Sequence, residues 1–185
     1  MASTTIDPHL SIDIGGDIFE DKDNGELTAI GYAANRRGVM RGFAGIIDAN
    51  FPGDTDAYRI HLDSEPEIGT ALISGDTFDS TLWVAHILSG ETEGDPLILP
   101  LYNGTANAIN QLARRCDTTL QLRVSLSDYG DRAPLVAHTI RAAVRDADYG
   151  TRTKTDVVLY LGEENSDSAK SVLNYLGLSE DQGTS

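Results

Sequence analysis

The chain has 185 residues, of which 40% are hydrophobic and 23% charged, and a formal net charge of -15 at pH 7. This negative charge is spread along the whole chain, which argues against direct binding to nucleic acid or anionic lipid, since both need clustered Lys and Arg. The single cysteine, Cys116, excludes an intrachain disulfide and a multi-cysteine metal cluster. The polar N-terminus and the short apolar runs indicate neither a signal peptide nor membrane insertion.

The kind of charge is also informative. Lysine occurs only at Lys22, Lys154 and Lys170, arginine fills the other basic positions, and aspartate outnumbers glutamate. A compact state with so much acidic charge is destabilised by self-repulsion unless salt screens it. The composition therefore favours a protein adapted to molar salt over an ordinary acidic protein.

The N-terminal half of the chain predicts short strands separated by turns. Residues 9–19 alternate apolar and polar side chains, as expected for a strand with one dry face. An Asn-Gly turn within the acidic segment 21–26 leads into a second strand at 27–34. A third strand is expected at 39–47. The next segment, 48–56, is expected to be a loop with a turn at Pro52-Gly53, and a strand follows at 58–62.

The middle of the chain predicts the centre of the fold. A short strand is expected at 70–73, and residues 82–88 around Trp83 read as a strand buried on both faces. The apolar run 97–102 contains Pro100, which places it near a sheet edge or a bulge. The Asn103-Gly104 pair predicts a turn, although it also begins a glycosylation sequon.

The C-terminal half mixes helices and strands. Residues 105–116 have a helical apolar period, and 118–126 is the cleanest strand alternation in the chain. Residues 134–147 fit either state, and we assign the first half to a strand. A buried strand is expected at 157–161. A helix follows at 165–176, and a flexible tail at about 179–185.

These elements amount to eight to ten short strands and two or three short helices, without the repeated strand–helix alternation of a parallel sheet. The predicted fold class is all-β, a single jelly-roll β-sandwich formed by one domain over residues 1–185.

No catalytic, cofactor-binding or metal-binding residue is assigned. The histidines His9, His61, His86 and His138 form no close pair, and His86 is expected to be a hydrogen-bonded core residue because it shares a strand face with aliphatic side chains. The acidic segment 21–26 fails the EF-hand spacing and reads as a solvated turn. The chain has neither a G-x-S-x-G elbow nor a P-loop.

Five arginines form the local basic patches of this acidic chain. Because Arg pairs with carboxylates through two hydrogen bonds, these residues are predicted to lie at subunit interfaces. Ion pairs within one chain are the alternative. The residues are Arg36, Arg37, Arg41, Arg114 and Arg115.

The chain resembles the smaller major capsid protein of haloarchaeal icosahedral viruses with an internal membrane, the sphaerolipovirus group. The features that carry this resemblance are the M-A-S-T-T-I-D start, the strand succession through T-T-L-Q-L-R-V-S-L and the Asp- and Thr-rich composition. The resemblance implies a non-enzymatic capsid subunit with an upright single jelly roll. It also implies assembly with copies of itself and a larger jelly-roll partner, contacts to vertex or membrane-associated virion proteins, and synthesis in the host cytoplasm before incorporation into the virion.

Two other functions remain open. A carbohydrate- or ligand-binding β-sandwich, calcium dependent through the aspartate loops, is the alternative, and exposed aromatic side chains near those loops would favour it. A glycoside-cleaving or isomerising jelly-roll enzyme ranks third, because 29 acidic residues produce carboxylate pairs at every spacing by chance.

Overall fold

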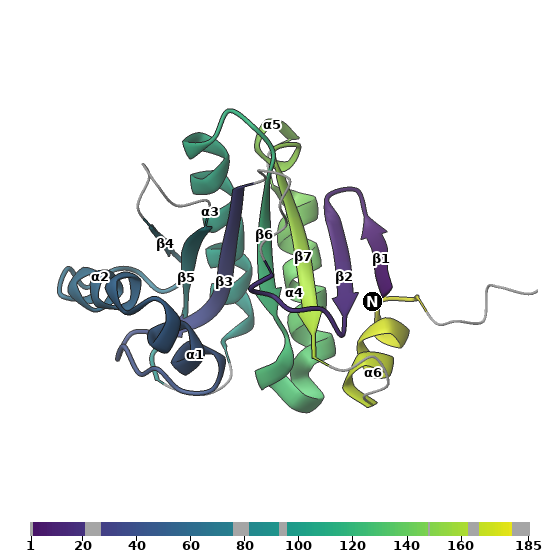
Figure 1. Ribbon diagram of the computed structural model, residues 1–185, viewed down its shortest axis with the longest axis horizontal. Coiled ribbons are helices and arrows are strands. Elements are labelled where there is room, and N and C mark those ends of the chain that lie inside the picture. Colours follow the sequence, from purple (N-terminus) through teal and green to yellow (C-terminus); the bar gives the residue numbers. More distant parts are fainter. Residues whose placement is uncertain are drawn as a thin grey trace, which may run out of the picture.

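The computed structural model describes residues 2–20, 27–75, 82–92, 96–147, 149–162 and 167–178. Within these ranges the strands are β1 (Ala2–Asp7), β2 (Leu10–Ile14), β3 (Leu27–Asn35), β4 (Ala71–Ser74), β5 (Leu82–Gly90), β6 (Leu120–Ser125) and β7 (Thr155–Leu161). They form one mixed sheet in the order β1-β2-β7-β6-β3-β5-β4 (Figure 1). The central strands β2, β7, β6, β3 and β5 run parallel, whereas β1 and β4 at the two edges are antiparallel to their neighbours.

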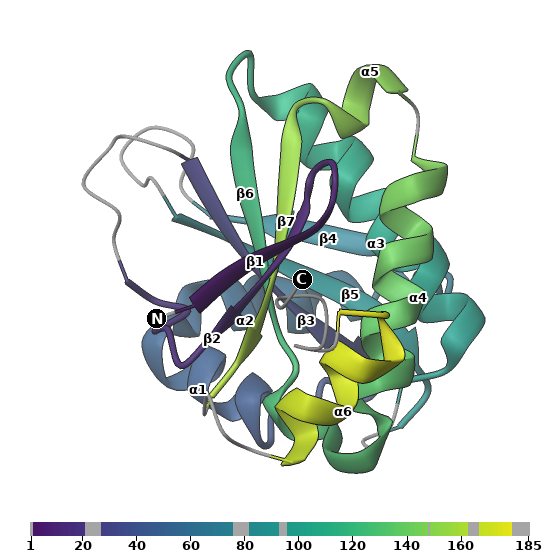
Figure 2. The same cartoon turned by 90° about the vertical axis from the view of Figure 1, so that its right-hand side faces the viewer.

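Helices cover both faces of this sheet. Within the described ranges they are α1 (Phe43–Asn50), α2 (Pro52–Leu62), α3 (Ile98–Arg115), α4 (Ala133–Asp146), α5 (Tyr149–Arg152) and α6 (Asp167–Tyr175), with a 3₁₀ helix, η1 (Ser127–Arg132). Figure 2 shows α3, α4 and α6 on one side of the sheet and α1 and α2 on the other. The molecule therefore has three layers, as expected for parallel strands joined by helical crossovers.

The hydrophobic core lies on both faces of the sheet. On the side of α3, α4 and α6, Leu122 and Val157 are buried with Ile109 and Ile140. On the side of α1 and α2, a second cluster includes Ile30, Val84, Ile47 and Tyr58. Strands covered on both faces read as continuous apolar runs, which explains the composition of β5 and β7.

The predicted all-β jelly roll is wrong. Residues 39–47 form a loop and the start of α1, and the expected loop 48–56 is occupied by the end of α1 and the start of α2. Residues 58–62 belong to α2, 97–102 are the N-cap and the first residues of α3, and 134–147 form α4 and its C-terminal end. The sheet is also mostly parallel, contrary to the prediction that no parallel sheet is present.

Prolines explain three of these errors. Pro52 is the first residue of α2, Pro134 is the second of α4, and Pro100 lies in the first turn of α3. Proline is compatible with the first turn of a helix, because the backbone N–H that it lacks has no intrahelical partner there. Pro52 was instead interpreted as part of a turn and Pro100 as a mark of a sheet edge, and the segment that begins at Pro134 was assigned in its first half to a strand.

Gly104 was read as part of a turn but lies inside α3. A Cβ atom there would be 2.7 Å from Ile87 Cγ2, so the missing side chain lets α3 approach β5 closely.

The other predicted strands and helices overlap elements of the structure, although the strand expected at 9–19 extends only over Leu10–Ile14. Strands were expected where β2, β3, β4, β5, β6 and β7 lie, and helices where α6 and most of α3 lie. β1 was not predicted. The acidic segment 21–26 and the tail 179–185 fall outside the described residues, and the single domain over 1–185 stays a prediction.

A carboxylate with two arginine partners fastens the edge strand β1 to α4. Asp7 accepts hydrogen bonds from Arg141 Nε at 2.7 Å and from Arg145 Nε at 2.9 Å, and the second nitrogen of each guanidinium contacts its other oxygen. These bonds, led by that of Arg141, lower the pKa of Asp7 from 3.8 to about 2. The ion pairs therefore stabilise the fold only while Asp7 is ionised.

We expect Asp7→Asn to lower the free energy of unfolding at pH 7 by about 1–2 kcal/mol, a value reduced for the solvent exposure of Arg145. Because the folded-state pKa is depressed, this contribution is present above about pH 4 and is lost as the pH falls toward 2. Urea unfolding at pH 7 and pH 3 measures it. Asp56→Asn, at an exposed ion pair, is the control and should change stability by less than about 0.5 kcal/mol. An equal loss in both variants would contradict the proposed role of Asp7.

Candidate ligand-binding site

The topology places a crevice at one edge of the sheet. β3 and β6 are parallel neighbours, so they end at the same edge. The chain that leaves β3 continues into α1 on one face, whereas the chain that leaves β6 continues through η1 into α4 on the other (Figure 2). Open α/β sheets bind ligands outside the carboxyl ends of their strands, where connections diverge in this way.

A cavity of about 320 Å³ lies at this edge. Three segments line it, each following the end of a parallel strand: β3, β5 or β6. Arg41, Gly42 and Thr92 in its wall are exposed, so the cavity opens to solvent. The lining residues that the argument uses are Asn35, Arg41, Phe43, Ser89, Ser125 and Asp128.

The N-terminus of α1 points at the cavity wall. Gly42 is its N-cap, with φ 54° and ψ -131°, a backbone conformation that residues with a side chain rarely adopt. No side chain at the N-cap bonds the first turn. Instead, the backbone N–H of Phe43 donates to the carboxylate of Asp128 in η1. Helix N-termini carry partial positive charge and unpaired N–H groups, so they attract anions.

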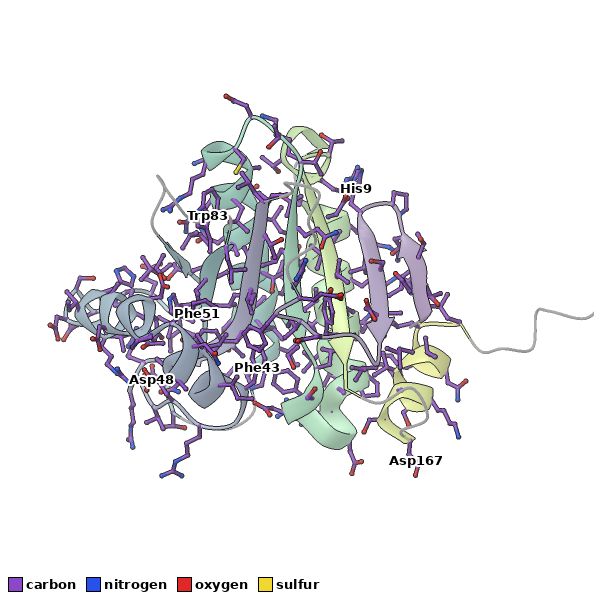
Figure 3. All side chains as sticks on the ribbon, in the orientation of Figure 1. His9, Phe43, Asp48, Phe51, Trp83 and Asp167 are labelled. Atoms are coloured by element: carbon purple, nitrogen blue, oxygen red, sulfur yellow. The ribbon has the colours of Figure 1, made fainter. Side chains whose placement is uncertain are left out.

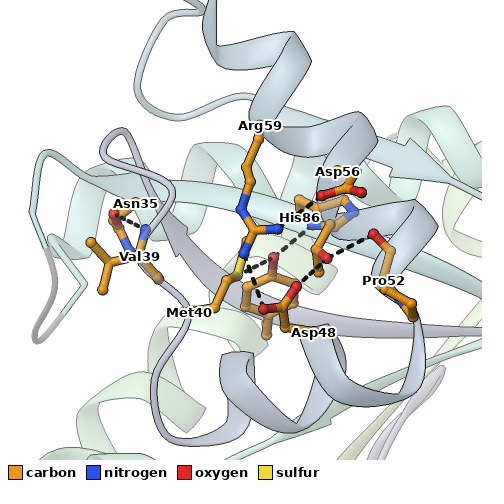
Figure 4. Close-up of polar contacts among 10 residues, drawn as sticks. Asn35, Val39, Met40, Asp48, Pro52, Asp56, Arg59 and His86 are labelled. Atoms are coloured by element: carbon orange, nitrogen blue, oxygen red, sulfur yellow. Dashed lines mark hydrogen bonds and ion pairs between the residues drawn. The ribbon is translucent and has the colours of Figure 1, made fainter.

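The loop between β3 and α1 is held by one asparagine. Asn35 Oδ1 accepts hydrogen bonds from the backbone N–H groups of Arg37 at 3.1 Å and Val39 at 3.2 Å. Its Nδ2 donates to the carbonyl of Val39 at 2.9 Å (Figure 4). Because Asn35, Val39 and Arg41 all line the cavity, these bonds fix the shape of one wall.

A buried histidine in β5 supports the wall that is formed by the loop between β3 and α1. His86 is fully buried, with Nδ1 2.7 Å from Tyr32 Oη and Nε2 2.8 Å from Ser74 Oγ. Its ring stacks on that of Tyr58 at 4.8 Å, and Tyr58 donates a hydrogen bond to the carbonyl of Asn35 at 2.9 Å. Burial lowers the pKa of His86 to about 3, so the ring is neutral at physiological pH. The prediction of a hydrogen-bonded core histidine is confirmed.

Helices α1 and α2 are joined by an ion-pair cluster centred on Arg59. The guanidinium of Arg59 contacts Asp48 Oδ2 and Asp56 Oδ1, both at 3.0 Å (Figure 4). Asp48 also accepts a hydrogen bond from Thr55. Asp48 is therefore paired with Arg59 between the two helices, whereas Asp56 is paired with it within α2, and the predicted solvated loop around them does not exist.

Aromatic rings cover the adjoining side of α1. Phe19, in the loop after β2, stacks on Phe43 with ring centroids 5.9 Å apart and on Phe51 at 6.2 Å. Figure 3 labels Phe43, the first residue of α1, and Phe51, which lies between α1 and α2. These rings fix α1 against the loop that follows β2.

The five arginines predicted to lie at subunit interfaces are dispersed. Arg41 lines the cavity, while Arg36 donates to the carbonyl of Pro66 at 2.7 Å and contacts Glu91 at 3.3 Å. Arg115 donates to the carbonyl of Ile73 at 3.2 Å. Arg37 and Arg114 are exposed on separate elements. An interface role for these residues stays a prediction.

The cavity was not predicted from the sequence. The residues that could have indicated it are small or polar side chains at the ends of three predicted strands: Asn35, Ser89 and Ser125. They were not grouped because the strands were taken to be antiparallel, which would send their ends to opposite edges. Within the described ranges, no three His, Cys, Asp or Glu side chains are grouped to hold a metal ion, and no helix is long and apolar enough to cross a membrane.

The structure is similar to solved macrodomains. The macrodomain of Thermus aquaticus DarG aligns with TM-score 0.64 and 16% identity over 82% of this chain and 97% of that chain. Thermosipho africanus DarTG in complex with ADP-ribose aligns with TM-score 0.69 and 16% identity over 95% of this chain and 47% of that chain. A mutant of the Oceanobacillus iheyensis macrodomain aligns with TM-score 0.61 and 21% identity over 95% of this chain and 96% of that chain. No family model and no curated protein matches the sequence. At these identities the similarity shows the macrodomain fold.

This similarity overturns the predicted capsid function. The macrodomain fold is α/β, not an upright jelly roll, so the resemblance to haloarchaeal capsid proteins is wrong. The predicted capsid partners and the predicted location in the virion depended on that resemblance and are wrong as well. The prediction that the chain is not an enzyme depended on the same assignment and is corrected too. A ligand-binding module, the predicted alternative, agrees better with the fold, although not as a β-sandwich.

The buried histidine makes a testable contribution to stability. The pKa of His86 is lowered from 6.5 to about 3. The stabilisation that the neutral His86 ring gives the folded protein is therefore fully present above pH 6.5. Below that pH the unfolded chain binds a proton that the folded ring excludes, which costs about 1.4 kcal/mol per pH unit. We expect His86→Gln to remove this slope between pH 6.5 and pH 5, and to lower stability at pH 7.5 by about 1–3 kcal/mol.

Urea unfolding at several pH values measures both effects. His138→Gln, at an exposed histidine on α4, is the matched control and should keep the wild-type pH slope. If His86→Gln also keeps that slope, the histidine is not held neutral in the folded protein.

Proposed function

We propose that this chain binds ADP-ribose, free or as a group attached to a macromolecule, in the cavity at the carboxyl ends of β3, β5 and β6. The observation that carries the proposal is the position of this cavity beside the N-terminus of α1. It is supported by the fold shared over 95% of this chain with a protein solved in complex with ADP-ribose.

The chemistry of the lining supports a ligand with phosphates and hydroxyl groups. Arg41 supplies a guanidinium and α1 supplies its positive N-terminal end, both of which attract phosphate oxygens. Asn35, Ser89 and Ser125 carry donors and acceptors suited to ribose hydroxyls. The volume of about 320 Å³ lies at the lower end of the range for small-molecule pockets, and the open mouth leaves room for the rest of a larger molecule.

Hydrolytic release of an attached ADP-ribosyl group is a second candidate function. The observation that favours hydrolysis here is the carboxylate of Asp128 in the cavity wall, since a carboxylate near a bound ligand is able to accept a proton from an attacking water. Release of ADP-ribose from a modified protein, followed by mass spectrometry, separates hydrolysis from binding alone.

Isothermal titration tests the binding proposal. ADP-ribose should bind at least about tenfold more tightly than AMP, a difference of about 1.4 kcal/mol, because AMP lacks the second phosphate and ribose. The titration is repeated from low to multimolar salt, since a protein with net charge -15 repels an anionic ligand until salt screens it. No heat with ADP-ribose at any salt concentration would overturn the proposal.

A substitution in the cavity wall tests the location of the site. Ala44 on α1 lines the cavity, whereas Ala49 on the same helix is exposed and does not line it. We expect Ala44→Trp to weaken ADP-ribose binding more than about tenfold, because the indole fills the cavity. Ala49→Trp is the matched control and should bind as the wild type does. Equal binding by both variants would place the ligand elsewhere.

A further inference from the structure

We propose that Asp128 is a specificity-determining residue of this cavity, a built-in carboxylate that competes with the anionic part of the ligand for the N-terminus of α1. The inference rests on the proposed function in that it concerns the same cavity. Asp128 discriminates among ligands that differ in negative charge.

A side chain from outside the helix bonds the start of α1. Its own N-cap residue is Gly42, which has no side chain to accept a hydrogen bond. The group that bonds the Phe43 N–H is a carboxylate from η1, 85 residues further along the chain. A Cβ atom at position 42 would lie 2.5 Å from Asp128 Oδ2, so glycine at this position makes room for the carboxylate. Asp128 thus occupies, from outside the helix, the place that an anion would take.

The same carboxylate belongs to the cavity wall. Asp128, Gly42, Phe43 and Arg41 all line the cavity, and Arg41 and Asp128 are the charged side chains among its described lining residues. A phosphate that approaches the N-terminus of α1 therefore meets a negative charge already bonded there. It binds only if it tolerates that charge or if Asp128 moves away.

The 3₁₀ helix η1, which carries Asp128, is exposed enough for the Asp128 side chain to move. All six residues of η1 are described, and each of them is at least partly exposed. Gly130 interrupts the helical turn with φ 47° and ψ -125°, and a Cβ atom there would meet nothing within 4 Å. Displacement of the Asp128 side chain therefore disrupts little packing.

The experiment compares two variants of the full chain. Asp128→Asn keeps an oxygen that can accept the Phe43 N–H bond but removes the charge. Asp131→Asn, in the same η1 turn and exposed, removes an equal charge away from the cavity lining and controls for long-range electrostatics. Three probes are titrated into the wild type and both variants: ADP-ribose, inorganic pyrophosphate and uncharged adenosine.

The expected result is selective. Asp128→Asn should bind ADP-ribose and pyrophosphate at least about fivefold more tightly than either the wild type or Asp131→Asn, with adenosine unchanged. Raising the salt concentration should reduce this gain, because the repulsion that Asp128 exerts is screened. Equal gains in the two variants, or no gain with pyrophosphate, would overturn the role of Asp128.

The same data distinguish this inference from the proposed function. If pyrophosphate binding responds to Asp128→Asn while ADP-ribose binds to none of the three proteins, the competitor role stands and the ADP-ribose proposal fails. If ADP-ribose binds to all three equally, and pyrophosphate binding is also unaffected, the site stands and the competitor role fails.

Discussion

The parallel pairing of β3 with β5 on one side and β6 on the other is the constraint on which the rest of the structure depends. It brings the carboxyl ends of three strands to one edge of the sheet, although β6 begins 85 residues after β3 ends. To reach β6 from β5, the chain must cross β3, and α3 makes that crossing. The cavity is the consequence, since each of its three walls follows the end of one of these strands.

The wall that follows β3 is supported more firmly than the wall that follows β6. Asn35 and the buried contacts of His86 and Tyr58 hold the loop between β3 and α1. In contrast, η1 has no fully buried residue and reaches the other wall mainly through Asp128 and Tyr129. The wall after β3 is held by buried contacts, whereas the wall formed by η1 is exposed. The anionic group of a ligand is therefore able to replace the Asp128 carboxylate without disturbing the core. The net charge of -15 fits this arrangement, because salt that stabilises the acidic surface also screens Asp128 from a phosphate.

Much of the secondary structure could be predicted from the sequence, but the fold could not. The alternation of Leu120, Leu122 and Val124 located β6 correctly, and these side chains do face the core. The polar residues between them were expected to be exposed, whereas Arg123 is buried and donates hydrogen bonds to the carbonyls of Ile18 and Glu20. A strand whose polar residues find buried partners resembles, in sequence, the half-exposed strand of a sandwich. Together with the helices that begin at proline, this produced an all-β interpretation.

The candidate site was beyond the reach of periodicity, because it depends on which strands are neighbours. Asn35, Ser89 and Ser125 are ordinary turn-forming residues until β3, β5 and β6 are known to be parallel and adjacent. The measurement that tests the central claim most directly is the mapping of backbone amide chemical shifts during titration with ADP-ribose. The account predicts that the largest shifts fall at residues 35–44, 89–92 and 125–129. Shifts confined to another part of the molecule, or none at saturating ligand, would contradict it.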